Sequence, residues 1–135
     1  MLKLLSDNDV LGHVKCLAEI CQSTPWDEFW HDLGCIVCKF GEVGLPANAP
    51  DSDVWQACQA NEMVLITANR NADDPTSLEV TIRKRNQTHC LPVLTLSDAD
   101  RVLHDRQYAE AVARRLLEIL LEIDLYRGTG RLFLP

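Results

Sequence analysis

The sequence has no long hydrophobic run and no excess of basic charge. None of its 135 residues lies in a stretch that approaches the roughly 20 apolar residues of a membrane-spanning helix. The N-terminus lacks the basic segment, long apolar core and small-residue cleavage site of a signal peptide. We therefore expect no membrane association and a cytoplasmic location. The net charge of −7 also argues against a broad nucleic-acid-binding face, because phosphate contacts supply most of that affinity.

The sequence contains six cysteines but lacks the spacing of a zinc site. Cys35 and Cys38 have Cys-x-x-Cys spacing, yet no second pair follows them. This pair falls in a predicted strand, whereas a thioredoxin-type motif opens a helix. We expect buried, reduced thiols that behave as small hydrophobes. A thiol oxidoreductase that uses Cys35 and Cys38 is a minor alternative.

Short apolar runs alternate with amphipathic segments along the chain. The apolar runs predict strands at residues 2–5, 35–40, 63–67 and 92–96, and a fifth short strand or a docking tail at 131–134. Helical spacing predicts helices at 10–21, 25–33, 51–61, from 73–76 to about 85, and at about 105–126. In the helix at 25–33 we expect Trp26, Phe29, Trp30 and Leu33 to face inward. This order predicts an α/β fold, a three-layer α/β/α sandwich with a four- to five-stranded, mainly parallel sheet, in one domain spanning 1–135.

Two segments are candidates for contacts beyond the core. The predicted helix at about 105–126 has an apolar face broad enough for burial on two sides, so we expect a homodimer; the alternative is that this face only covers the sheet. The loop at 41–50 contains glycines and prolines and is a candidate rim or lid.

Polar side chains follow the first and third predicted strands. Asp7 comes directly after the first strand, and Asn69 and Asn71 follow the third. Because the carboxyl ends of parallel strands meet at one edge, we expect these side chains to lie together, with Asp53 brought in by the preceding helix. Such oxygen ligands suit Mg²⁺ or Mn²⁺, which can activate water and stabilise charge on a phosphate. The expected reaction is phosphodiester hydrolysis.

At these residues the sequence resembles the PIN-like domains, a family that includes small bacterial proteins. The matching motifs are an acidic residue that opens a helix, here Asp53, and the segments LLSDND at 4–9 and ITANRN at 66–71. The resemblance implies a metal-dependent ribonuclease, the toxin half of a toxin–antitoxin pair, with an RNA substrate and an antitoxin or other protein partner. It implies a catalytic site of Asp7, Asp53, Asn69 and Asn71, in which Asp7 and Asp53 bind Mg²⁺ or Mn²⁺. The sequence departs from the family pattern because asparagine replaces the acids expected at 69 and 71 and the glutamate expected at 8.

The missing acids leave other interpretations open. One is a catalytically inactive PIN-like module that acts through protein–protein interaction or self-association. Another is a receiver domain, but its phosphoacceptor aspartate would stand at the end of the third strand, where this chain has asparagine. Simple structural roles also fit these residue types, because aspartate at 7 and 53 suits a helix start and Asn69 suits a turn.

Overall fold

The computed structural model, which describes residues 2–70, 72 and 74–135, contains one five-stranded sheet. All neighbouring strands pair in parallel, in the order β2-β1-β3-β4-β5. The strands are β1 (Lys3–Ser6), β2 (Ile36–Cys38), β3 (Met63–Thr67), β4 (Val93–Leu96) and β5 (Arg131–Leu134). The predicted α/β sandwich is confirmed, and the segment at 131–134 is a fifth strand.

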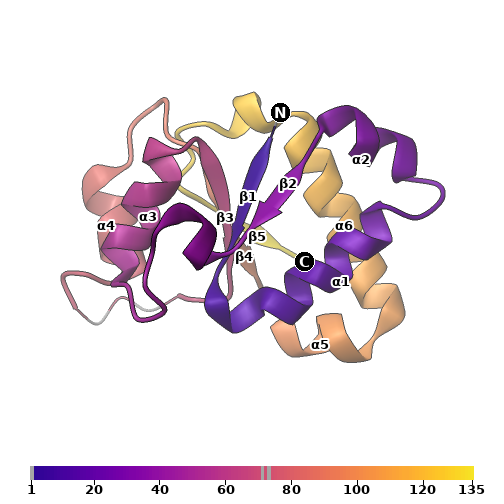
Figure 1. Ribbon diagram of the computed structural model, residues 1–135, viewed down its shortest axis with the longest axis horizontal. Helices are drawn as coiled ribbons and strands as arrows, with labels where there is room; N and C mark the ends of the chain where they lie inside the picture. The colour runs from indigo at the N-terminus through magenta and orange to yellow at the C-terminus, as the bar shows by residue number, and fades with distance from the viewer. Residues whose placement is uncertain (1, 71, 73) are drawn as a thin grey trace.

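Helices cover both faces of this sheet (Figure 1). They are α1 (Leu11–Cys21), α2 (Asp27–Leu33), α3 (Asp51–Ala60), α4 (Leu78–Arg85), α5 (Ala99–His104) and α6 (Arg106–Leu121), with short 3₁₀ turns η1 (Asn8–Val10), η2 (Phe40–Val43) and η3 (Ile123–Tyr126). One face packs against α3 and α4, and the other against α1, α2, α5 and α6. The architecture therefore has three layers.

The two faces of the sheet explain why its strands are almost wholly apolar. Successive side chains of β1 point to opposite faces, so Leu4 packs in the cluster that contains Leu17 and Leu116, and Leu5 packs in the cluster that contains Trp55 and Leu78. Both leucines are fully buried. Strands buried on two faces read as continuous hydrophobic runs, which is why the boundaries of β3 could be predicted.

Three predicted helices differ in detail from those observed. The long C-terminal helix ends at Leu121 and gives way to η3, and the separate helix α5 precedes it. The fourth helix starts at Leu78, where the Ser77 hydroxyl accepts a hydrogen bond from the Val80 N–H at 3.4 Å; residue 73 of its predicted opening lies outside the described residues. In α2 the side chain of Phe29, which we expected to face inward, is 51% exposed.

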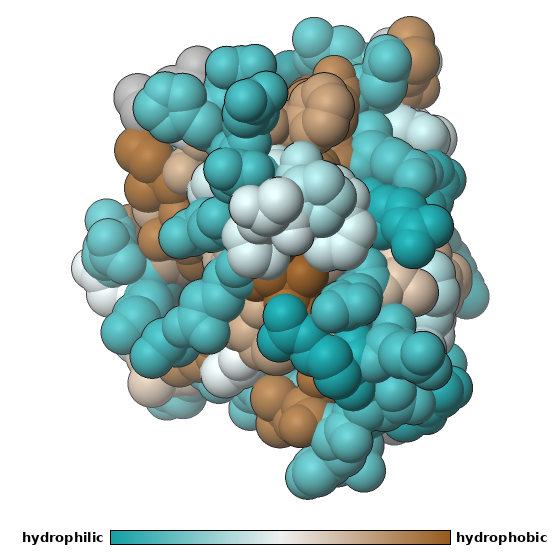
Figure 2. All heavy atoms as spheres, turned by 90° about the vertical axis from the view of Figure 1, so that its right-hand side faces the viewer, coloured by the Kyte–Doolittle hydropathy of each residue, from teal (hydrophilic) through white to brown (hydrophobic). Residues whose placement is uncertain are grey.

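The broad apolar face of α6 is used within the chain. Its buried side chains pack in the cluster shared with α1, α2, α5 and β5. Leu121 and Leu125 stay exposed at its C-terminal end. On the side of the molecule shown in Figure 2, hydrophobic residues form separate patches among hydrophilic ones. The breadth of the face thus does not require a second subunit, and the homodimer stays a prediction.

None of the helices in the described residues is both long and apolar enough to cross a membrane.

Candidate functional site

A polar cleft lies at the carboxyl edge of the sheet, beside the ends of β1 and β3. The chain passes from β1 to β2 on one side and returns to β3 on the other, so the strand order reverses here. Ligand sites of doubly wound sheets occupy this position. The cleft has a volume of about 190 Å³, and its polar lining residues are Asp7, Asn8, Asp9, Asp51 and Asn69.

The end of β1 holds Asp7 against the end of β3. The Asp7 N–H donates to the Ile66 carbonyl at 3.0 Å, and the Thr67 hydroxyl donates to Asp7 Oδ2 at 2.6 Å. Burial raises the pKa of the Asp7 carboxyl above its ordinary value; the Thr67 hydrogen bond opposes this shift, while the negative charges of Asp9 and Asp51 add to it. Asp7 is therefore a carboxylate whose ionised form the fold disfavours.

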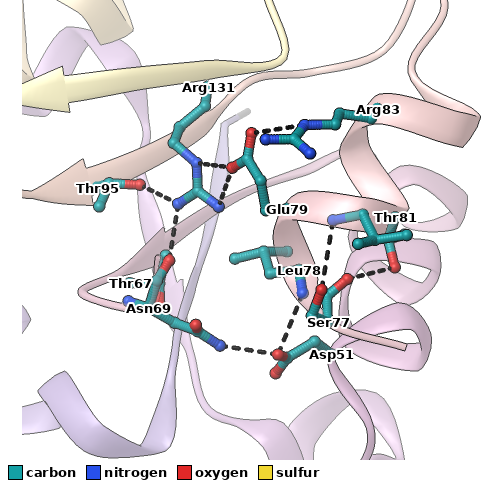
Figure 3. A network of polar contacts seen from close by, with 11 residues as sticks. Asp51, Thr67, Asn69, Ser77, Leu78, Glu79, Thr81, Arg83, Thr95 and Arg131 are labelled. Carbon is teal, nitrogen blue, oxygen red and sulfur yellow. Dashed lines mark hydrogen bonds and ion pairs between the residues drawn. The ribbon is translucent and has the colours of Figure 1, made fainter. Parts of the chain in front are cut away.

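Asp51, at the start of α3, is bonded to the residue that follows β3. The Asn69 side-chain amide donates from Nδ2 to Asp51 Oδ2 at 2.8 Å, and the same oxygen accepts the Leu78 N–H at 3.2 Å (Figure 3). The Asn69 N–H donates to the Thr67 hydroxyl at 2.9 Å. The structure thus brings Asp7 and Asn69 into one cleft, as predicted, and joins them through Thr67.

The acid that α3 contributes to the cleft is Asp51, and not Asp53 as the sequence suggested. Asp53 is exposed and does not line the cleft. Residues two apart in a helix point in nearly opposite directions, so α3 can aim only one of these two acids at the site. Asn71, the remaining predicted site residue, lies outside the described residues.

Arg131 of β5 supports the cleft from the other side of Asn69 (Figure 3). Its side chain is only 7% exposed, and Nη1 donates to the Asn69 carbonyl at 2.8 Å and to the Thr95 hydroxyl at 2.6 Å. Nε donates to Glu79 Oε2 at 3.0 Å, and Nη2 lies 3.0 Å from the same oxygen as an ion pair. A buried cation therefore anchors the backbone of residue 69.

The loop at 41–50 forms part of the rim. Ala47 and Ala49 line the cleft, and the Asn8 amide donates to the Ala47 carbonyl at 3.0 Å. The amide at position 8, where the family pattern has glutamate, therefore fixes the loop. This contact supports the predicted rim.

Sequence reasoning missed Asp51, Glu79 and Arg131. A signal for Asp51 was present, because it precedes the inward-facing Val54, Trp55 and Cys58 by 3, 4 and 7 residues and so shares their helix face. A signal for Arg131 was weaker: it is the one charged residue in an otherwise apolar final strand. Its pairing with Glu79 joins segments 52 residues apart, and no local pattern indicates that.

The donor groups of the cleft fit a divalent cation poorly. Among residues 2–70, 72 and 74–135, no three His, Cys, Asp or Glu side chains come together in a way that could hold a metal ion. Oδ2 of Asp51 already accepts two hydrogen bonds, and Oδ2 of Asp7 accepts one. Mg²⁺ is bound in near-octahedral geometry by carboxylate and water oxygens. The Asn69 N–H group that points at Asp51 is a hydrogen-bond donor and cannot serve as such a ligand.

The environments of the cysteines are typical of structural thiols and not of reactive ones. All six are free, and Cys21, Cys58 and Cys90 are buried. Burial raises the pKa of Cys35 to about 12 and also raises that of Cys38. A redox-active thiol needs the opposite shift, so this observation counts against an oxidoreductase that uses this pair.

Comparisons of the chain with protein-family models, with curated proteins and with solved structures each found no match.

Proposed function

We propose that the chain is a PIN-like module that acts by binding another protein and that its carboxyl-edge cleft does not cleave RNA. The observation that carries this proposal is the hydrogen bond from the Asn69 amide to Asp51. It occupies the carboxylate that would otherwise be available to a cation.

The chemistry of residue 69 decides whether the cleft favours a cation. An aspartate there would stand beside Asp51 as a second negative charge, and a divalent cation would relieve their repulsion. Asparagine is neutral and supplies its own N–H donor, so Asp51 is stabilised without a metal. A metal would have to break this bond and the Leu78 bond before it could use the same oxygen. The oxygen Oδ2 of Asp51 is therefore closed to a metal by the protein's own hydrogen bonds.

Calorimetric titration of Mn²⁺ tests this proposal on the unaltered chain and three variants. The unaltered chain should show no specific binding at millimolar Mn²⁺, whereas Asn69→Asp should gain it. Asn61→Asp, which makes the same change of charge at an exposed position at the end of α3, should bind no better than the unaltered chain. Specific binding by the unaltered chain that is lost in Asp7→Asn would overturn the proposal.

A second candidate function is a metal-dependent ribonuclease of toxin–antitoxin type, and one observation favours it. Asp7 stands in a half-buried position although desolvation and the charges of Asp9 and Asp51 all disfavour its ionised form. Functional sites often retain such costly groups. This candidate predicts RNA cleavage that requires Mn²⁺ and disappears in Asp7→Asn; cleavage that survives this change, or no cleavage at all, contradicts it.

A further inference from the structure

A groove lies between α1 and the edge strand β2 and, among the described residues, it shares no lining residue with the carboxyl-edge cleft. Its volume is about 540 Å³, and its lining is mainly apolar, with Leu11, Ala18, Trp30, Cys35 and Val37. The strand β2 is the edge strand of the sheet, next to β1, and α1 lies on the face of the sheet that the groove borders. The groove is thus apolar surface that borders an edge strand.

The backbone of β2 offers hydrogen bonds on the side away from β1. The Ile36 N–H donates to the Leu2 carbonyl at 2.9 Å, so the peptide groups of Ile36 face β1. Backbone groups alternate in direction along a strand, so the N–H and C=O of Val37 face the outer edge. An extended segment can bond to such an edge and place every second side chain in an adjoining groove.

Lysines surround this edge in an otherwise acidic protein. Lys15 and Lys39 line the groove, and Lys3 of β1 lies on the opposite face of the sheet, the face to which Leu5 points. Within the described part of the chain, the ion pairs involve arginine or histidine and none involves these lysines. Glu19 is the one carboxylate in the groove lining. The described groove lining therefore carries two positive charges and one negative, with Glu42 Oε1 accepting the Lys39 N–H at 2.9 Å beside it, in a protein of net charge −7.

We propose that the β2 edge and its groove bind an extended, acidic segment of a protein partner, with apolar side chains in the groove and carboxylates near Lys15 and Lys39. This inference rests on the proposed function, because it names the surface through which the module binds. The unpaired lysines supply charge complementarity, and the outward peptide groups of Val37 favour a strand over a helix.

A second copy of the chain fits this surface less well. Pairing of two β2 edges about a twofold axis would bring the lysines of both copies to one interface, where like charges oppose association. A partner with acidic residues gains from the same charges. The short length of β2 limits the number of backbone bonds, so the affinity depends on the groove and on the lysines.

Binding of synthetic strand peptides tests the proposal. The probes are acetylated octapeptides in which Glu or Asp alternates with Val, Ile or Leu, with fluorescence anisotropy as the measure of affinity. Matched probes carry Lys in place of the acids, or N-methyl groups on alternate amides to remove backbone donors. The proteins are the full chain, the double variant Lys15→Glu with Lys39→Glu, and Lys84→Glu, an exposed lysine of α4 on the other face of the sheet.

The acidic probes should bind the full chain, and amide resonances of Val37 and Lys39 should shift. The double variant should bind the acidic probes at least about tenfold more weakly than the full chain does, and the full chain should bind the N-methylated probes more weakly by a similar factor. Lys84→Glu should change the affinity for the acidic probes by less than about twofold. The proposal is overturned if no acidic probe binds at millimolar concentration or if the lysine probes bind as tightly as the acidic ones. It is also overturned if Lys84→Glu weakens binding as much as the double variant does. A dimer that dissociates in the double variant would assign the edge to a second copy and would also overturn it.

None of these readouts involves a metal. If the peptides fail while only Asn69→Asp gains Mn²⁺ binding, this surface is wrong and the proposed loss of RNA cleavage stands. If the peptides bind and the unaltered chain also binds Mn²⁺, the surface stands and the proposal that the carboxyl-edge cleft does not bind metal is wrong.

Discussion

The carboxyl edge of the sheet and the outer edge of β2 differ in how their polar groups are satisfied. At the carboxyl edge, Asp7 and Asp51 accept hydrogen bonds from Thr67 and Asn69, and the Arg131 cation is paired with Glu79. At the β2 edge, the lysines that line the groove form no ion pair within the described residues.

The comparison shows that the position of a cleft in the fold and the availability of its groups for binding are separate properties. The carboxyl edge has the location in which doubly wound sheets bind ligands, but its groups are already bonded to one another. The β2 edge is not the usual position of a ligand site in such sheets. It nevertheless presents lysines without ion pairs among the described residues, apolar surface and outward-facing peptide groups. A ligand gains most where the protein has not already satisfied its own donors and acceptors.

Removal of Arg131 should have the largest effect on stability. Arg131→Met leaves the Glu79 carboxylate and the Thr95 hydroxyl without their buried partner, so we expect a loss of about 3 kcal/mol in the free energy of unfolding. Urea denaturation measures it. Arg106→Met is the matched control, because its ion pair with Glu110 is exposed and should contribute less than about 1 kcal/mol. Equal losses in the two variants would show that the Arg131 network does not hold the carboxyl edge together.

Asn69→Asp should leave charged groups at the carboxyl edge without a hydrogen bond between them, so that this edge, like the β2 edge, presents charge that is not paired within the described part of the protein. Without metal it replaces a hydrogen bond by a pair of like charges, so we expect a loss of about 1–3 kcal/mol in stability. Mn²⁺ should restore part of that loss, because a ligand that binds only the folded state stabilises it. Thermal unfolding with and without Mn²⁺ measures both effects. No loss of stability in the absence of metal would mean that the Asn69–Asp51 bond contributes little.

Asp7→Asn should stabilise the protein at neutral pH. The folded-state pKa of Asp7 is raised above its ordinary value of 3.8, so the folded state binds the proton more tightly than the unfolded state does. The contribution of Asp7 to stability therefore falls as pH rises from 3.8 through the raised pKa, and stays low above it. The unfolding free energies of the two proteins should diverge across that window, with Asp7→Asn the more stable at pH 7.

The exposed Asp53 provides the control for that measurement. Asp53→Asn removes the same charge from an exposed side chain and should change the unfolding free energy at pH 7 by less than about 1 kcal/mol. A neutral-pH stability of Asp7→Asn below that of the unaltered chain would contradict the assignment of Asp7 as a disfavoured carboxylate.

The smallest effect on stability is expected at the β2 edge. The double variant Lys15→Glu with Lys39→Glu changes exposed side chains without ion-pair partners among the described residues, so stability should change by less than about 1 kcal/mol. Urea denaturation again measures it. The same variant should lose peptide binding, which separates recognition from stability. A large loss of stability would mean that these lysines support the fold.

The strands could be predicted from the sequence because strands buried on both faces appear as short, nearly continuous apolar runs. The run Met63–Ile66 is hydrophobic and is completed by the buried Thr67, and the segment 63–67 is strand β3 at the predicted boundaries. In α2, the spacing puts residues 26, 29, 30 and 33 on one helix face, but in the structure Trp30 is buried and Phe29, at the border of that face, is 51% exposed. Periodicity predicts an element more reliably than it predicts the rotation of a short helix.

The candidate site was only partly predictable for the same reason. The carboxyl ends of β1 and β3 placed Asp7 and Asn69 correctly, because the topology of a parallel sheet fixes that edge. The choice between Asp51 and Asp53 depends on the rotation of α3, and the spacing to Val54, Trp55 and Cys58 was the usable clue. The contacts of Arg131 join β5 to α4 and to the end of β3, so they exist only after the chain has folded.

The Asn69 side-chain amide gives the most direct measurement of whether the carboxyl-edge cleft is closed to metal. Its two proton resonances can be followed in ¹H–¹⁵N spectra of the unaltered chain while Mg²⁺ is added to millimolar concentration. The bond to Asp51 predicts slowly exchanging resonances that do not shift, whereas the amide of the exposed Asn61 serves as a reference for non-specific effects. Loss of protection of the Asn69 amide on addition of Mg²⁺, with Asn61 unchanged, would show that the cation takes Asp51 from Asn69 and would contradict a closed cleft.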